Sequence, residues 1–111
     1  SLEGDKAIEM YKRAISLNPN LEKANIELGK KYFEKNDFSN ASYYYAKMTT
    51  SDLESWKNLK ESSMNLKNYD LARDAAKKIA GLEPKNPHIF KELGDLCEKT
   101  GEIDNAISSY K

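Results

Sequence analysis

The chain has 111 residues, with 18 basic and 18 acidic side chains, and this balance argues against a nucleic-acid or anionic-membrane surface, which needs a basic excess. One cysteine and one histidine exclude a disulfide framework and a cysteine-rich zinc site, and the short apolar runs exclude a membrane span or a signal peptide. A mean hydropathy of −0.83 is typical of a thin helical array, in which each unit buries only one stripe.

One apolar spacing recurs four times along the chain, in segments that begin at residues 4, 38, 69 and 103. Its steps of three and four residues mark one face of an α-helix. The second position is always alanine: Ala7, Ala41, Ala72 and Ala106, which lie 34, 31 and 34 residues apart. A small residue at a recurring place predicts that another helix comes close there.

Three helices of a first type alternate with these second-type helices. Each contains a core leucine, at Leu28, Leu59 and Leu93, and a glycine follows it in Gly29 and Gly94. Glycine inside a helix costs about 1 kcal/mol relative to alanine. Its recurrence beside the leucine therefore predicts close helix packing at that position.

Turn residues separate the helices. Proline-containing turns at 18–20 and 83–87 lie between pairs, and tight turns at 36–37, 68 and 100–101 lie within pairs. Asn86 is expected to cap the helix that begins at Pro87. The middle junction lacks three residues and the proline, and Ser51–Glu54 there predicts a capping box with Ser51 as the cap, after a helix that ends near residues 49–50.

The whole pattern resembles the tetratricopeptide repeat, in which large–x–x–Leu–Gly–x–x–Tyr is followed by Ala, an aromatic residue, Ala and Pro. The clearest stretches are residues 4–20 and the combination of Leu93–Gly94 with residues 101–107. The repeat at 53–86 departs most, because Lys60 replaces the glycine and Ala76 replaces the second-helix aromatic residue. We expect that repeat to pack least tightly.

The resemblance implies an all-α fold: a right-handed superhelical array of antiparallel helix hairpins, or α-solenoid, over residues 1–111. We predict the second helix of a truncated repeat at 4–19, repeats at 20–52 and 53–86, and a repeat truncated in its second helix at 87–111. Neither end has the polar outer face of a capping unit, so we expect a piece of a longer repeat protein. Stacking residues would then be partly uncovered at the ends, namely Ile8, Tyr11, Ile15, Ile107 and Tyr110.

No constellation of residues predicts catalysis, a cofactor or a bound metal. His88 has no convergent partners and is interpreted as a surface residue, and Cys97 as a small buried one. Tyr43–Tyr45 resembles a stacking platform for bases, but Tyr45 belongs to the core pattern and the chain has no basic excess. We expect no nucleic-acid partner and no membrane insertion.

In arrays of this class the first-type helices line a concave groove, and the residues off their core stripe face it. Three of these, Ile26, Phe33 and Met64, are apolar although the core pattern does not require it. They suit anchors for a bound peptide, and equally suit shielding of neighbouring helices. The complete predicted groove is Lys23, Ile26, Glu27, Lys30, Phe33, Glu34, Lys57, Asn58, Glu61, Met64, Asn65, Lys91, Glu92 and Asp95.

The resemblance also bears on one known ligand class. Relatives that bind chaperone C-terminal tails carry a lysine–asparagine–asparagine–lysine–arginine clamp for the terminal carboxylate. Asn58 fits the middle asparagine, but the flanking slots hold Ile26, Lys30, His88 and Glu92. Glu92 would repel a carboxylate, so we predict that this clamp is absent.

The sequence therefore predicts a non-catalytic protein–protein interaction scaffold that binds a peptide or helical segment of a partner in the concave groove. Two alternatives stay open: a spacer that self-associates end to end through exposed array ends, and an accessory domain of an enzyme elsewhere in a parent chain. The partner's identity is not encoded in any motif. The compartment is also unknown, with the cytoplasm favoured over an oxidising compartment.

Overall fold

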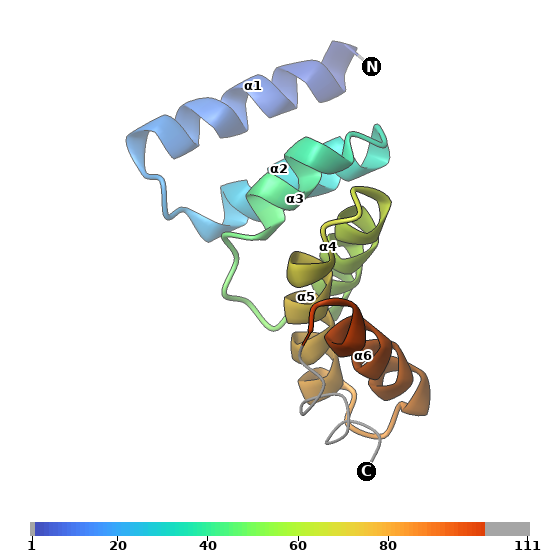
Figure 1. Ribbon diagram of the computed structural model, residues 1–111. Helices are drawn as coiled ribbons and strands as arrows, with labels where there is room; N and C mark the ends of the chain where they lie inside the picture. The colour runs from blue at the N-terminus through green and yellow to red at the C-terminus, as the bar shows by residue number, and fades with distance from the viewer. Residues whose placement is uncertain (1, 102–111) are drawn as a thin grey trace. The chain divides into compact units, whose positions relative to one another are not determined.

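The computed structural model describes the backbone of residues 2–101 and the side chains of residues 4–101. Within that range the chain forms six helices and no strand (Figure 1). They are α1 (Leu2–Leu17), α2 (Glu22–Glu34), α3 (Phe38–Tyr45), α4 (Leu53–Asn65), α5 (Tyr69–Leu82) and α6 (Pro87–Lys99). The predicted all-α repeat array is confirmed, and the helix expected after residue 101 lies outside the described residues.

The helices form two compact units, Ser1–Thr50 and Ser51–Lys111. In the first unit α2 packs against both α1 and α3, and in the second unit α5 packs against both α4 and α6. Most of the predicted core positions are buried, although those of α1 are only half-buried. Leu28, Ala41 and Tyr45 have no exposed surface, and Leu59 and Ile79 are each 1% exposed.

Gly29 allows α2 and α3 to approach closely. A Cβ atom at Gly29 would lie 2.8 Å from Cγ and Cδ1 of the Tyr45 ring, and real Cβ atoms do not come this near to other atoms. Because Tyr45 is fully buried, its ring has little room to move away. The prediction that the glycine serves close helix packing is confirmed at this position.

The repeat at 53–86, which we expected to pack least tightly, has an extensive contact between its two helices, and the expectation itself stays a prediction. α4 and α5 make the most extensive helix–helix contact in the described part of the chain. Small residues meet on both sides of this contact: Ser62 and Ser63 on α4, and Ala72, Ala75 and Ala76 on α5, all with no exposed surface. Small side chains on both helices let the backbones come together.

The turns within pairs follow the prediction. Asn36, Lys67 and Gly101 adopt positive φ angles of 59°, 58° and 82° directly after the first-type helices. Asp37 and Asn68 then cap α3 and α5, since each side chain accepts a hydrogen bond from a backbone N–H three residues later. The predicted cap at Asn86 is also confirmed, because its Oδ1 accepts from the backbone N–H of His88 at 3.0 Å.

The junction between α3 and α4 differs from the prediction. α3 ends at Tyr45, not near residues 49–50. The N–H groups of Ala46, Lys47 and Met48 still bond to carbonyl oxygens of α3, and Glu22 of α2 binds the two backbone N–H groups that follow. Its carboxylate accepts hydrogen bonds from the N–H groups of Thr49 and Thr50, at 2.6 and 2.5 Å, and from the Thr49 hydroxyl at 2.9 Å. These bonds hold the pKa of Glu22 below its ordinary value.

The predicted capping box at Ser51–Glu54 is also wrong. Asp52, one residue later, is the N-cap residue of α4. Its side chain caps no backbone N–H group; its carboxylate accepts a hydrogen bond from the Ser55 hydroxyl instead. Glu54 is exposed.

Candidate binding site

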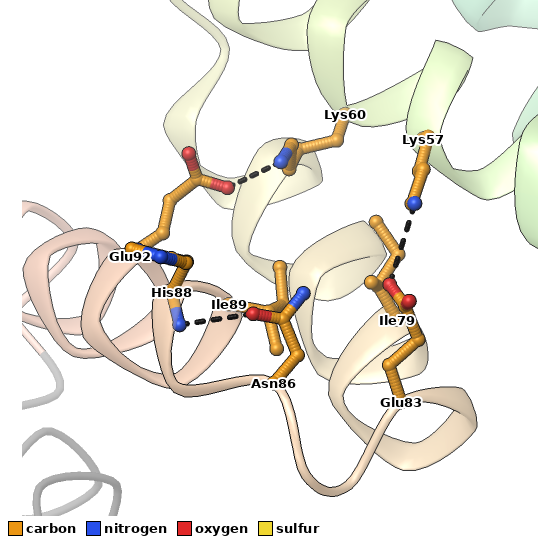
Figure 2. A pocket seen from close by; sticks show the side chains of 8 residues that line it. All are labelled: Lys57, Lys60, Ile79, Glu83, Asn86, His88, Ile89 and Glu92. Carbon is orange, nitrogen blue, oxygen red and sulfur yellow. Dashed lines mark hydrogen bonds and ion pairs between the residues drawn. The ribbon is translucent and has the colours of Figure 1, made fainter.

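A hollow of about 230 Å³ opens on the second unit, at the place where α4, α5 and α6 meet (Figure 2). Each helix contributes side chains from a different part of its length. The lining residues are Lys57 and Lys60 of α4, Ile79 near the end of α5, Glu83 and Asn86 of the following turn, and His88, Ile89 and Glu92 of α6.

The local sequence explains how these side chains come together. The turn at residues 83–86 reverses the chain, and Asn86 and Pro87 start α6 beside the end of α5. Ile79 and Ile89 are 1% and 4% exposed and belong to the buried core of the unit. They give the hollow an apolar floor, while its other lining residues are polar or charged.

Two ion pairs cross the rim of the hollow. Lys60 pairs with Glu92 and so connects α4 with α6, whereas Lys57 pairs with Glu83 at the end of α5 (Figure 2). The Nζ atom of Lys57 lies 3.4 Å from Oε1 of Glu83, and the Lys57 side chain is 51% exposed. Exposed pairs of this kind contribute at most about 1 kcal/mol, so Lys57 can leave Glu83 at little cost.

One polar atom of the hollow lacks a hydrogen bond. Oε1 of Glu83 is buried and accepts no hydrogen bond from the described residues, because the contact with Lys57 is an ion pair without hydrogen-bond geometry. A buried acceptor that makes no hydrogen bond is costly, and few occur in native proteins. Glu83 is therefore the place in the hollow where a better-aligned hydrogen-bond donor would be favoured.

The structure brings only part of the predicted groove together in this hollow. Lys57 and Glu92 line it. Asn58 is half-buried on α4, and Lys91 and Asp95 form a 3.7 Å ion pair on α6. The other predicted residues of this unit, Glu61, Met64 and Asn65, are exposed on α4.

The predicted groove residues of the first unit all belong to α2. Lys23 and Glu34 are exposed, whereas Ile26, Glu27 and Lys30 are half-buried. Phe33 is also half-buried, and its ring packs edge-on against Phe38 with the centroids 5.9 Å apart. This packing supports the shielding role that the sequence left open for Phe33. Of the three proposed anchors, Met64 is the exposed one, at 36%.

Sequence reasoning missed most residues of the hollow, namely Lys60, Ile79, Glu83, Asn86, His88 and Ile89. It assigned Ile79 to the core and Asn86 to a cap, and both are also true, while His88 is exposed as predicted. Among these residues, the sequence position of Lys60 could have indicated the hollow. A long charged side chain at the glycine position of the repeat has to extend out of the helix contact, and here it extends to Glu92.

Two of the three residues that we expected to be partly uncovered at the start of the chain are so. Ile8 is buried, and Tyr11 and Ile15 are half-buried. Ile107 and Tyr110 lie outside the described residues. The exposed apolar side chains of α1 are instead Met10 at 55% and Leu17 at 84%.

Neither a metal-binding group of side chains nor a membrane-spanning helix occurs among the described residues. Residues 4–101 contain no group of three or more His, Cys, Asp or Glu side chains that could hold a metal ion. None of the six described helices is long and apolar enough to cross a membrane.

Comparison with known proteins supports the repeat. The family model described as "Tetratricopeptide repeat" matches residues 5–21, and no curated protein matches the chain. A crystal structure of MamA is 25% identical over 96% of this chain, with a TM-score of 0.68. A second MamA crystal structure is also 25% identical, over 97% of the chain, with a TM-score of 0.70. This chain spans 64% and 61% of the length of those two MamA chains.

The recognition made from the sequence is thereby confirmed: the chain carries a tetratricopeptide repeat and folds as an array of such helix pairs. Repeats of this class support a role as a protein-interaction scaffold, and such scaffolds are generally non-catalytic.

Proposed function

We propose that the protein is a non-catalytic interaction scaffold that binds an internal peptide or helical segment of a partner protein on its first-type helices. In the second unit these helices are α4 and α6, and the hollow between Lys57, Lys60 and Glu92 is the centre of the proposed site. The remaining predicted groove residues of this unit extend the site along α4 and α6.

The observation that carries this proposal is the composition of the hollow. A buried apolar floor surrounded by a small number of polar groups is typical of a site that binds one side chain of a ligand. The rim holds two lysines and two glutamates, whose charges cancel. This mixture suits an internal segment that carries both signs of charge better than a chain end.

A terminal carboxylate does not fit this site. Glu92 occupies the slot where the chaperone-tail clamp has its arginine, and it lies on the rim of the hollow. Lys60, which could attract a carboxylate, is already paired with Glu92. We therefore expect a bound peptide to gain nothing from a free carboxyl terminus.

The test is binding to an array of short peptides that are blocked at both ends. In the variant His88→Trp the exposed His88 is replaced by a large ring that fills the hollow, and we expect this variant to lose the peptides that the unaltered protein selects. The matched control Glu54→Trp places the same ring at an exposed position on α4 that does not line the hollow. Equal binding by all three proteins would refute the site.

The predicted absence of the carboxylate clamp is tested by comparing two forms of each peptide. Each selected peptide is measured with a free carboxyl terminus and as the amide. Tighter binding of the free acid would contradict the absence of the clamp.

Self-association is a second candidate, and one observation favours it. Met10 and Leu17 lie seven residues apart, hence on the same face of α1, and both are largely exposed. If this face joins two chains, the mass measured by sedimentation rises with concentration, and Leu17→Glu abolishes the rise. A constant monomer mass would exclude this candidate.

A further inference from the structure

We propose that the hollow of the second unit receives a basic side chain of the bound segment, an arginine above all. Its guanidinium donates a hydrogen bond to Glu83, and its methylene stem lies on Ile79 and Ile89. This inference rests on the proposed function and adds the chemistry of the residue that anchors the partner.

The unmet hydrogen-bonding need of Glu83 decides the sign of the ligand charge. The net charge of the rim does not decide it, since Lys57 and Lys60 balance the two glutamates. Oε1 of Glu83 is a buried acceptor that makes no hydrogen bond to a described residue, although the Lys57 ammonium lies 3.4 Å away, and an acidic side chain would bring a further acceptor to it. A cationic donor satisfies this oxygen and also restores the charge balance if Lys57 moves away.

Lys57 is held loosely enough to be displaced. Its ammonium group lies 3.4 Å from Glu83 without forming a hydrogen bond, and half of its side chain is already exposed. The Glu83 side chain is only 29% exposed, so the carboxylate stays in place when Lys57 returns to water. The other pair differs, because Lys60 is 22% exposed and hydrogen-bonded to Glu92.

Arginine fits this arrangement better than lysine for a geometric reason. Its planar fork can donate two parallel hydrogen bonds to one carboxylate, whereas an ammonium group acts as a point charge. Its three methylene groups suit an apolar floor such as the one that Ile79 and Ile89 provide. The charged head then lies at the rim, beside Glu83.

The experiment uses N-acetyl-arginine methylamide as the probe and NMR of the isotope-labelled chain as the readout. We expect saturable shifts of the backbone amide signals at residues 57–60 and 83–92. The citrulline analogue has the same shape without the charge, and it should bind about tenfold more weakly, as expected for the loss of a charge-assisted hydrogen bond. The glutamate analogue should give no saturable shifts.

Three variants separate this inference from unspecific attraction. Glu83→Gln should weaken the arginine probe about tenfold, to the level of citrulline. Lys57→Ala removes the competitor of the probe, so it should strengthen binding severalfold; this outcome tests the proposal even if Glu83→Gln fails to fold. Glu54→Gln removes a carboxylate from an exposed position outside the hollow and should change nothing.

The inference is overturned if the glutamate probe binds as well as the arginine probe. It is also overturned if Lys57→Ala and Glu83→Gln both leave the arginine affinity unchanged, or if the arginine probe gives no saturable shift. Selected peptides that depend on residue 88 but contain no basic residue would refute this inference while leaving the proposed function intact. If the peptides did not depend on residue 88 and the arginine probe gave no saturable shift, both the proposed function and this inference would be refuted.

Discussion

Two glycines of this chain allow the close packing of α2 on α3 to be tested by the same chemical change in two surroundings. Gly29 and Gly81 both lie in helices, and replacing either by alanine gains up to about 1 kcal/mol of helix propensity. At Gly81 a Cβ would meet no atom within 4 Å. At Gly29 it would lie 2.8 Å from two carbons of the buried Tyr45 ring.

The expected effects on stability therefore differ. Gly81→Ala should stabilise the second unit by up to about 1 kcal/mol. Gly29→Ala makes the same gain but also overpacks a filled core, at a cost of about 1–3 kcal/mol. The two variants should differ by about this overpacking cost, with Gly29→Ala neutral to destabilised by about 2 kcal/mol.

The assay is denaturant unfolding followed by far-ultraviolet circular dichroism, with each variant compared with the unaltered chain. A double-mutant cycle then identifies the cause: Tyr45→Ala should cost less when it is combined with Gly29→Ala than when it is made alone, with a coupling of about 0.5–3 kcal/mol. If Gly29→Ala stabilised the chain as much as Gly81→Ala, the close approach at Tyr45 would be refuted.

Three further perturbations test other parts of the fold. The bonds to Thr49 and Thr50 lower the pKa of Glu22, so this carboxylate stabilises the native state at pH values above its ordinary pKa of 4.5. This stabilisation is lost as the pH falls further. Glu22→Gln should remove that part of the acid dependence, measured by unfolding at pH values from neutral to below 4.5. Leu59→Ala leaves a cavity at a site that is 1% exposed and should cost about 2–5 kcal/mol, whereas an unfolding midpoint within error of the unaltered chain would contradict its core role. Asn86→Ala removes the cap of α6 and should cost about 0.5–2 kcal/mol in the same assay, and rescue by Asp or Ser would assign the loss to the cap.

The sequence alone determined the features that depend on a repeated local pattern. The steps of three and four residues placed Leu28, Leu59 and Ala72 on buried helix faces, because a helical period assigns every residue to a side of its own helix. The glycine beside Leu28 predicted a close approach, since a residue that weakens a helix recurs only where its lack of a side chain is needed. Turn and capping residues act within a few positions, so the turns within pairs and the cap at Asn86 were also predictable.

The tertiary structure decided what depends on residues far apart in the chain. Beyond the end of α3 at Tyr45, the N–H groups of Thr49 and Thr50 bond to Glu22, which precedes Thr49 by 27 positions and lies on another helix. The hollow likewise exists only because three helices meet, and it combines a lysine at a glycine position with a glutamate 32 residues later. A periodic pattern reports which face of a helix is buried. It does not report which side chain of another helix comes within bonding distance, since that is fixed by how the helices pack.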